Sequence, residues 1–376
     1  MSLKFGAFMA PFHELGEDPT SALHWDLDLI EHLDRIGFDE VWIGEHHSGG
    51  WSLIASPELF LAAASQRTRR IRLGTGVVSL PYHHPLTATE RLILLDHLSH
   101  GRAMFGVGAG ISPADAYMMG VAAADQRRMM AESLEAIVAL LHNAPVSIKT
   151  DWFELREARP QLRPTSPQGL DLVVASAGSE RGMRLAGRYG LGTLSFAGRP
   201  GMPDAPLAQL WKAAEDEAAA HGQIADRAQW RIAICVHVAD TTEEALNQVR
   251  PGMTRWFQEY VRETFGAPAT LPEGREADAA VECGAIIVGS VRDVIEGIER
   301  LVEQSGGFGT LLVNTHDWAT REQVRRSFDL MRRHVIPHFS GSVDGLRGSQ
   351  RWVSENRGDF AAQAREAALA AAGRQT

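Results

Sequence analysis

The feature that most constrains the fold of this chain is a regular alternation of short apolar runs with longer segments whose apolar residues recur at helical spacing. The first pair is the run 3–9 and the helical pattern 21–36, which stops at Gly37. Later runs such as 231–238 are apolar nearly throughout, which is typical of parallel strands covered by helices on both faces. The alternation therefore predicts an α/β protein built from repeated strand-helix units.

Eight such units fit into roughly the first 340 residues. The expected strands are 3–9, 40–44, 71–79, 102–108, 170–175, 192–196, 230–238 and 310–314. Eight units predict a closed (β/α)8 TIM barrel over 1–340, with an open doubly wound sheet as the alternative. Two insertions, 111–126 after strand four and 251–284 after strand seven, are longer than simple connections need.

The longer insertion, 251–284, is rich in Gly and Pro, and we expect it to form a mobile lid. After the last unit the pattern lapses into an Ala-rich tail, 341–376. We expect this tail to pack on the barrel or on a partner subunit.

Charge and cysteine usage exclude several classes of partner. The chain has 37 Lys and Arg against 47 Asp and Glu, a formal charge of −10, and no long basic run, which disfavours nucleic acid and anionic membrane surfaces. No apolar stretch approaches the roughly 20 residues that a membrane span needs, and a strand-like run begins almost at Met1, so no signal peptide is expected. Cys235 and Cys283 form no CxxC pair, which predicts neither a disulfide nor a thiolate metal site and fits the cytoplasm.

In a barrel of this kind the active site lies where the strands end and their loops begin. The residues at those positions are Phe12, His13, Glu45, His46, His47, His83, His84, Gly106 to Gly110, Ser176 to Ser179, Ser195 and Phe196. Neighbouring side chains of a strand point to opposite faces, so His46 and His47 would not readily converge on a metal ion. A single histidine that exchanges a proton is the better functional candidate, while histidines that merely cap strand ends are the alternative.

Two small-residue motifs follow strands four and five. Gly106, Gly108 and Gly110 do not form a dinucleotide fingerprint, because Ile111-Ser112-Pro113 follows instead of a third glycine and a helix. They either let the backbone bend or leave room for a flat ring system. Ser176-Ala177-Gly178-Ser179 leads into a helix, where backbone N–H groups suit a phosphate, although a plain serine cap explains it equally well. The absence of a P-loop indicates a monophosphate rather than a nucleoside triphosphate.

Taken together, these residues resemble the bacterial luciferase-like family of flavin monooxygenases. The segments that carry the resemblance are 38–47 (FDEVWIGEHH), 72–77, 80–81, 84–85, 95–96, 101–102, 105–108, 174–179 and 287–290. Segments 9–13, 43–48 and 56–60 are most similar to the limonene monooxygenase branch.

The resemblance implies a barrel that binds reduced FMN, supplied by a separate flavin reductase, and forms a flavin hydroperoxide with O2. The oxygen would pass to a small apolar or aromatic organic substrate. His46 matches the catalytic histidine of the family, with Glu45 beside it, and Gly76-Val77 matches the site of a non-proline cis peptide beneath the flavin. Residues Ser176, Ala177, Gly178 and Ser179 match the phosphate-binding turn, and Ser195 and Phe196 match a segment at the ring.

The sequence departs from luciferase at two positions of the expected cofactor site. Gly108 stands where luciferase has a reactive cysteine, so light emission is not expected, and Ala109 replaces an arginine that helps to hold the phosphate. Arg181 is a candidate substitute.

The substrate space would be shaped by Phe12, His13, His84, Met118 and Phe196. The resemblance implies a homodimer and no metal. Epoxidation, hydroxylation and Baeyer–Villiger insertion all remain open. A deazaflavin-dependent oxidoreductase of the same fold and a non-catalytic flavin-binding protein are the alternatives, and a metal hydrolase is a third.

Overall fold

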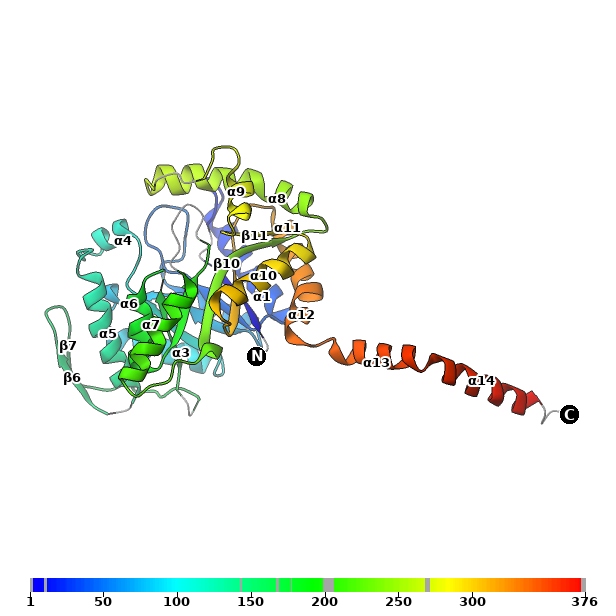
Figure 1. The fold of residues 1–376 in the computed structure, drawn as a ribbon. Helices are drawn as coiled ribbons and strands as arrows, with labels where there is room; N and C mark the ends of the chain where they lie inside the picture. The colour runs from blue at the N-terminus through cyan, green and yellow to red at the C-terminus, as the bar shows by residue number, and fades with distance from the viewer. Residues whose placement is uncertain are drawn as a thin grey trace.

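Eight parallel strands close into a barrel in the computed structural model (Figure 1). The structure describes residues 3–9, 12–142, 144–166, 169–176, 178–198, 206–267 and 271–372. The strands of the ring are β1 (Lys4–Met9), β2 (Glu40–Ile43), β3 (Arg72–Thr75), β5 (Ala103–Gly108), β8 (Asp171–Ser176), β9 (Gly192–Phe196), β10 (Trp230–Val238) and β12 (Thr310–Asn314). Strand β12 closes the ring because it pairs with β1 through Lys4 and Thr310 and with β10 through Arg231 and Thr310. The predicted TIM barrel is confirmed.

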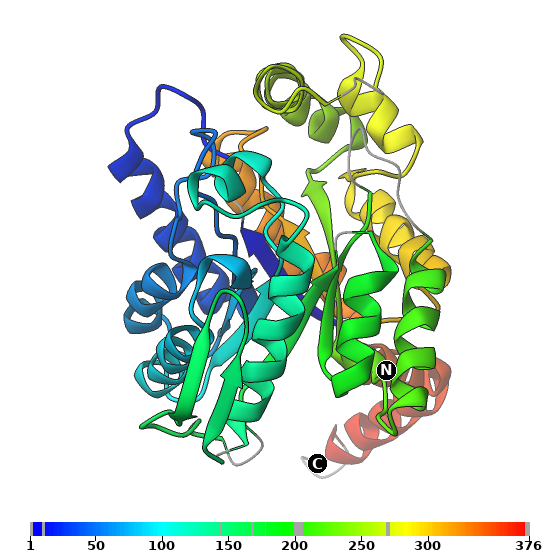
Figure 2. The ribbon, with the colours of Figure 1, turned by 90° about the vertical axis from the view of Figure 1, so that its left-hand side faces the viewer.

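A layer of helices surrounds the strands, as Figure 2 shows. These helices are α1 (Pro19–Ile36), α2 (Pro57–Arg67), α3 (Pro85–Leu98), α5 (Gln126–Leu141), α6 (Glu180–Tyr189), α7 (Leu207–Ala220), α10 (Val291–Ser305) and α11 (Arg321–Leu330). Local signals set their ends. Asp18 accepts the N–H of Ser21 at the start of α1, and Gly37 ends that helix with a φ of 88°, a conformation that glycine adopts without steric cost. The predicted helical pattern 21–36 ends where α1 ends, and α1 begins two residues earlier, at Pro19.

The inside of the barrel is filled with side chains and closed at its N-terminal end. The buried residues inside it are Phe8, Trp42, Met104, Val173, Leu194, Ala233 and Leu312. Toward the N-terminal ends of the strands, the guanidinium of Arg231 lies 2.8 Å from the carboxylate of Glu40 and 2.7 Å from that of Asp171. Glu40 begins β2 and Asp171 begins β8. The indole of Trp42 donates to Glu40 over 2.9 Å. Because the described residues plug this end, the barrel is open to a ligand at the C-terminal ends of its strands.

Several short elements were not apparent from the sequence pattern. A 3-10 turn, η1 (Leu80–Tyr82), follows the short strand β4 (Val78–Ser79), and α4 (Pro113–Met118) lies in the insertion after β5. An antiparallel hairpin of β6 (Val146–Lys149) and β7 (Glu154–Ala158) precedes β8. A second 3-10 turn, η2 (Arg227–Gln229), leads into β10. The expected strand 71–79 is interrupted after Thr75, and the Gly76–Val77 peptide bond that follows is cis.

The expected lid is mostly helical. Helix α8 (Thr242–Arg255) continues through Pro251 into the π-helical η3 (Trp256–Thr264), and α9 (Glu276–Glu282) and β11 (Ile287–Gly289) follow. The glycine at 252 does not mark a loop, since a Cβ there would lie 2.3 Å from the Cα of Trp318. It permits close packing of the helix on the loop after β12. Mobility of this segment remains a prediction.

The chain ends in a helical arm. After α11 come η4 (Met331–Val335) and α12 (Ile336–Ser340), followed by α13 (Asp344–Glu355) and α14 (Arg357–Ala372). Helices α13 and α14 have no buried residue and extend away from the barrel (Figure 1). The structure therefore does not lay this arm on the barrel, and its packing on a partner subunit remains a prediction. Within the described ranges, no helix is both long and apolar enough to cross a membrane.

Candidate active site

A cavity of about 660 Å³ opens at the C-terminal ends of the barrel strands. The predicted site residues that line it are Phe12, Glu45, His46, Gly76, Val77, Gly108, Ser176, Gly178, Ser179 and Phe196. They come from six strand ends that are far apart in the sequence. Ala177, the remaining residue of the predicted phosphate turn, lies outside the described residues.

Three residues that we expected to shape the substrate space do not line this cavity: His13, His84 and Met118. His84 is exposed at the start of α3, with its ring 6.1 Å from that of Phe153. Met118 is 63% exposed at the end of α4. The placement of a residue just after a strand brings it to the rim but does not decide whether its side chain points inward.

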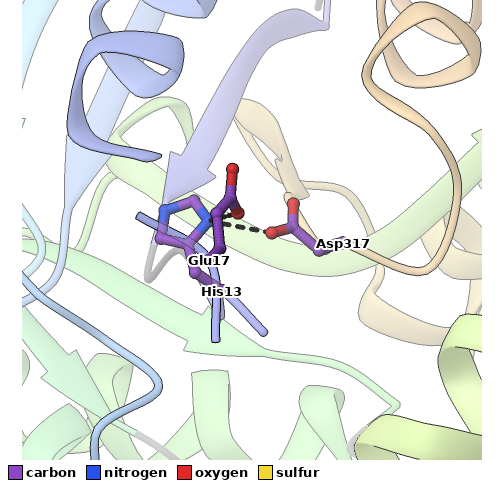
Figure 3. Close-up of side chains that lie close together, drawn as sticks. All are labelled: His13, Glu17 and Asp317. Atoms are coloured by element: carbon purple, nitrogen blue, oxygen red, sulfur yellow. Dashed lines mark hydrogen bonds and ion pairs between the residues drawn. The ribbon is translucent and has the colours of Figure 1, made fainter. Parts of the chain in front are cut away.

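His13 takes part instead in a buried charge cluster (Figure 3). Its Nε2 lies 2.9 Å from Asp26 of α1, and its Nδ1 lies 2.8 Å from Asp317 in the loop after β12. His13, Glu17 and Asp317 bring their ligand atoms within 4.8 Å of one another, as a cation site would. Both ring nitrogens already face carboxylates, however, and Glu17 also pairs with Arg321. The imidazolium itself therefore supplies the positive charge, and the cluster ties the loop after β1 to α1 and β12.

This cluster predicts a loss of stability at alkaline pH. Burial opposes the charge on His13, but hydrogen bonds with Asp26 and Asp317 raise its pKa from 6.5 to about 10. The charged His13 ring therefore adds its full contribution to the free energy of unfolding below pH 6.5, and this contribution is lost as the pH rises through about 10. Urea unfolding between pH 6 and 10 should therefore show a steeper loss for the wild type than for His13→Gln. His24→Gln, a change at an exposed position of α1, should follow the wild type; equal slopes for the wild type and His13→Gln would contradict the assignment.

Glu45 is the buried anion at the end of β2. Its Oε1 lies 3.0 Å from His47 and 3.1 Å from His83, and its Oε2 accepts the backbone N–H of Ser79 over 3.1 Å. Burial disfavours the carboxylate, but these hydrogen bonds prevail and lower its pKa to about 2. Glu45 is therefore ionised at neutral pH and raises the pKa of His47. His47 and His83 support this carboxylate, and neither of them lines the cavity.

His46 is set apart from the other histidines of the rim. Its backbone N–H donates to Ile54 over 3.1 Å, and its side chain is 18% exposed and borders the cavity. Burial lowers the pKa of His46, while the carboxylates of Asp115 and Glu45 oppose this effect. A neutral imidazole beside the cavity can accept a proton from a bound molecule.

Gly106 and Gly108 of β5, the fourth strand of the barrel, allow close packing between strands. A Cβ on Gly106 would lie 1.9 Å from the carbonyl oxygen of Thr75, and one on Gly108 would lie 2.6 Å from the side chain of Val77. Close backbone approach at Gly106 is a role that neither interpretation of this motif included, whereas Gly108 and Gly110 line the cavity, so that room for a flat ring there remains a prediction. The cis peptide at Gly76–Val77, which the resemblance implied, is present, and both of its residues line the cavity.

The start of α6 forms a region suited to an anion. Ser179 caps this helix without a side-chain hydrogen bond to it, and the Ser176 hydroxyl donates to the carbonyl of Ser179 over 2.5 Å. Arg181 in the first turn and Arg127 in the first turn of α5 both line the cavity. Neither arginine forms an ion pair with any residue in the described part of the chain. A helix N-terminus and two uncompensated cations fit a phosphate.

The mouth is covered by aromatic residues that the sequence argument did not identify. Tyr260 of η3 lines the cavity, and its ring lies 4.5 Å from that of Phe12 and 5.6 Å from that of Trp256. Trp51, after β2, donates to Thr264 over 3.3 Å. Tyr260 lies in the second insertion and Arg127 in the first turn of the barrel helix α5, and only the tertiary structure brings both to the strand ends.

The comparisons with known proteins agree with this geometry. The family model for luciferase-like monooxygenases matches residues 3–308. The chain is 52% identical over 359 residues to 4-hydroxyprotoasukamycin monooxygenase of Streptomyces nodosus subsp. asukaensis, covering 94% of this chain and 96% of that protein. It is 45% identical over 354 residues to limonene 1,2-monooxygenase of Rhodococcus erythropolis, covering 94% and 91%.

Among solved structures, the oxygenating constituent of 3,6-diketocamphane monooxygenase from Pseudomonas putida, a type II Baeyer–Villiger enzyme in complex with FMN, superimposes with a TM-score of 0.76. That match covers 90% of this chain and 98% of that chain at 26% identity. The cavity, the neutral histidine and the match over most of the chain lead to one conclusion: the chain belongs to the luciferase-like monooxygenase family, and its relatives include the limonene monooxygenase branch.

Proposed function

We propose that this protein is the oxygenase of a two-component system that uses reduced FMN and O2 to oxygenate a small apolar or aromatic organic substrate. The observation that carries the proposal is one cavity that joins a neutral histidine, His46, to an anion-binding region at Arg127 and Arg181. The names of the two relatives above, both monooxygenases of organic compounds, support it.

The residues of the cavity fit a flavin mononucleotide. Its phosphate would be held by the N-terminus of α6, at Ser176, Gly178 and Ser179, together with the two arginines. Its ring would lie along Gly76, Val77, Gly108, Glu45 and Phe196. When bound, reduced FMN supplies the electrons that activate oxygen.

The remaining chemistry falls to side chains of this chain. His46 would accept or return a proton beside the ring, and the Glu45 carboxylate keeps a fixed negative charge next to it. Phe12 and Tyr260 would cover the mouth and exclude water from the reacting atoms.

The test is oxygen incorporation. Purified protein is mixed with FMN, NADH and a flavin reductase under 18O2, together with a panel of terpenes, cyclic ketones and aromatic compounds. We expect a product that contains one 18O atom and requires the reductase. Reduction of a deazaflavin by a substrate alcohol, without oxygen incorporation, would contradict the proposal and favour the oxidoreductase alternative. Flavin binding without turnover on any compound would favour the non-catalytic one.

The phosphate-binding role predicts a selective loss of affinity. Arg181→Met should weaken FMN binding by about tenfold, because a charged hydrogen bond to the phosphate is lost at a partly exposed site. Riboflavin, which has no phosphate, should bind equally well to variant and wild type when flavin fluorescence is titrated. Arg184→Met is the matched control, since Arg184 lies on the same helix but pairs with Glu180 and does not line the cavity. An equal loss for FMN and riboflavin would disprove the role.

Assembly and location belong to the same proposal. The arm of α13 and α14 leaves Leu346, Trp352, Val353 and Leu369 exposed, and we propose that it packs on a second copy of the chain in a homodimer. In sedimentation experiments the full chain should be a dimer, and a variant ending at residue 340 should be more dissociated.

The cysteines bear on location. Cys235 and Cys283 are unpaired, which supports a cytoplasmic location that cell fractionation would test.

A further inference from the structure

The insertion after β5 brings a buried carboxylate to the loop that contains His46. Asp115 lies in α4, where its backbone N–H donates to the N-cap Ser112 over 3.2 Å, and it is 3% exposed. Its Oδ1 accepts the hydroxyl of Ser48, and its Oδ2 accepts the backbone N–H of His47 over 3.2 Å. Asp115 therefore fastens α4 to the two residues that directly follow His46.

The same carboxylate lies next to the imidazole of His46. The distance from Asp115 Oδ2 to His46 Nδ1 is 3.9 Å, and within the described ranges the ring of His46 has no hydrogen-bond partner. Glu45, the other nearby carboxylate, is fully engaged with His47, His83 and Ser79. Nδ1 of His46 thus lies on the side of Asp115, and Nε2 is the ring nitrogen that would be left to serve the cavity.

We propose that Asp115 is a positioning residue for His46, whose carboxylate keeps the ring proton on Nδ1 and leaves Nε2 unprotonated toward the cavity. At 3.9 Å the carboxylate makes no direct hydrogen bond to Nδ1, but a negative charge on that side of the ring favours a proton on Nδ1 over one on Nε2. A carboxylate at this position also stabilises the imidazolium that forms when Nε2 accepts a proton. The catalytic use of this arrangement rests on the proposed function, whereas the tautomer does not.

The first experiment needs no variant at Asp115. Nitrogen NMR of the flavin-free protein labelled with 15N-histidine reports the tautomer of each histidine, and His46→Gln identifies the signal of residue 46. We expect the neutral ring of His46 to carry its proton on Nδ1. A proton on Nε2 would overturn the proposal. Because this measurement does not involve turnover, it stays informative if the protein proves not to be a monooxygenase.

The second experiment removes the charge. The charged and titratable groups that act on His46 are Glu45 and His47 of its own loop and Asp115 of α4, and Tyr260 and Arg127 line the same cavity. Asp115→Asn should lower the titration midpoint of His46 and move the acid limb of the kcat/KM profile to lower pH, because a carboxylate favours the charged ring. At neutral pH kcat/KM should fall by about tenfold or more. Asp115→Glu, which keeps the charge, should restore part of the shift.

Asp293→Asn is the matched control for this variant. Asp293 occupies the same third position of a helix, α10, is bonded to its own N-cap Ser290, and lies outside the cavity. It should leave the titration of His46 unchanged. An unchanged titration in Asp115→Asn would overturn the proposal, and if that variant does not fold, the wild-type tautomer decides. If His46 shows the expected tautomer and titration but the protein forms no oxygenated product, the proposed function is refuted and the positioning role of Asp115 still holds.

Discussion

Replacement of His46 by alanine is expected to lower product formation by about 100-fold or more while changing the affinity for FMN by less than about twofold. His46 is the histidine that borders the cavity with an unengaged ring, and proton transfer by a positioned side chain contributes factors of this size. The flavin contacts we propose come from the α6 N-terminus, Arg127, Arg181 and the Gly76–Val77 segment, none of which this change removes. Initial rates of 18O incorporation and a fluorescence titration of FMN measure the two quantities.

The matched control for this variant is His84→Ala. Both histidines follow a barrel strand, but His84 is exposed at the start of α3 and does not line the cavity. Its replacement should leave turnover within about twofold of the wild type. Wild-type turnover in His46→Ala would refute the catalytic role of His46, and a loss in both variants would indicate a general effect on folding.

Replacement of Arg231 by methionine is expected to lower the free energy of unfolding by about 3 to 5 kcal/mol. Arg231 is 3% exposed and lies between Glu40 and Asp171 at the closed end of the barrel, with its guanidinium 5.0 Å from the ring of Trp42. Glu40 is 1% exposed, so the variant leaves a carboxylate buried without a counter-charge. Urea unfolding followed by circular dichroism measures the difference.

Arg326→Met provides the comparison for the buried pair. Arg326 pairs with Asp240 at 2.6 Å, but both side chains are more than half exposed, and exposed pairs of this kind contribute less than about 1 kcal/mol. The double variant Glu40→Gln with Arg231→Met should recover part of the lost stability, because it removes the unpaired charge. If Arg231→Met lowers the free energy of unfolding no more than Arg326→Met does, the buried cluster of Arg231, Glu40 and Asp171 is not a source of stability.

The barrel was predictable because its signals are local and repeated. The apolar run 230–238 predicted β10 with the bounds that the structure has. The helical course of the lid was not predictable, since Pro251 and Gly252 indicate a loop when read alone. Only the close approach of Trp318 explains the glycine at 252. The hairpin of β6 and β7 is short and largely exposed, so it lacks the buried pattern that identifies the other strands.

The residues that line the cavity were predicted only in part, because the sequence signal for them is also local. The rule that strand ends form the active site placed His46, Gly76 and Ser176 correctly at its wall. The same rule also selected His13 and His84, which point elsewhere. Asp115 and Tyr260 belong to helices of the two insertions and Arg127 to the barrel helix α5, and no local pattern connects them with the strand ends.

The sequence by itself determined the class of fold, the number of strands in the barrel and the family, because each depends on periodicity and on motifs read within a few residues of one another. The tertiary structure decided which side chains face the cavity, which charges are paired, and which histidine is left unengaged. Those properties depend on contacts between segments far apart in the chain, such as His13 with Asp317 and His46 with Asp115. Burial and the placement of neighbouring charges set the protonation of these groups, and both arise only when the barrel has closed.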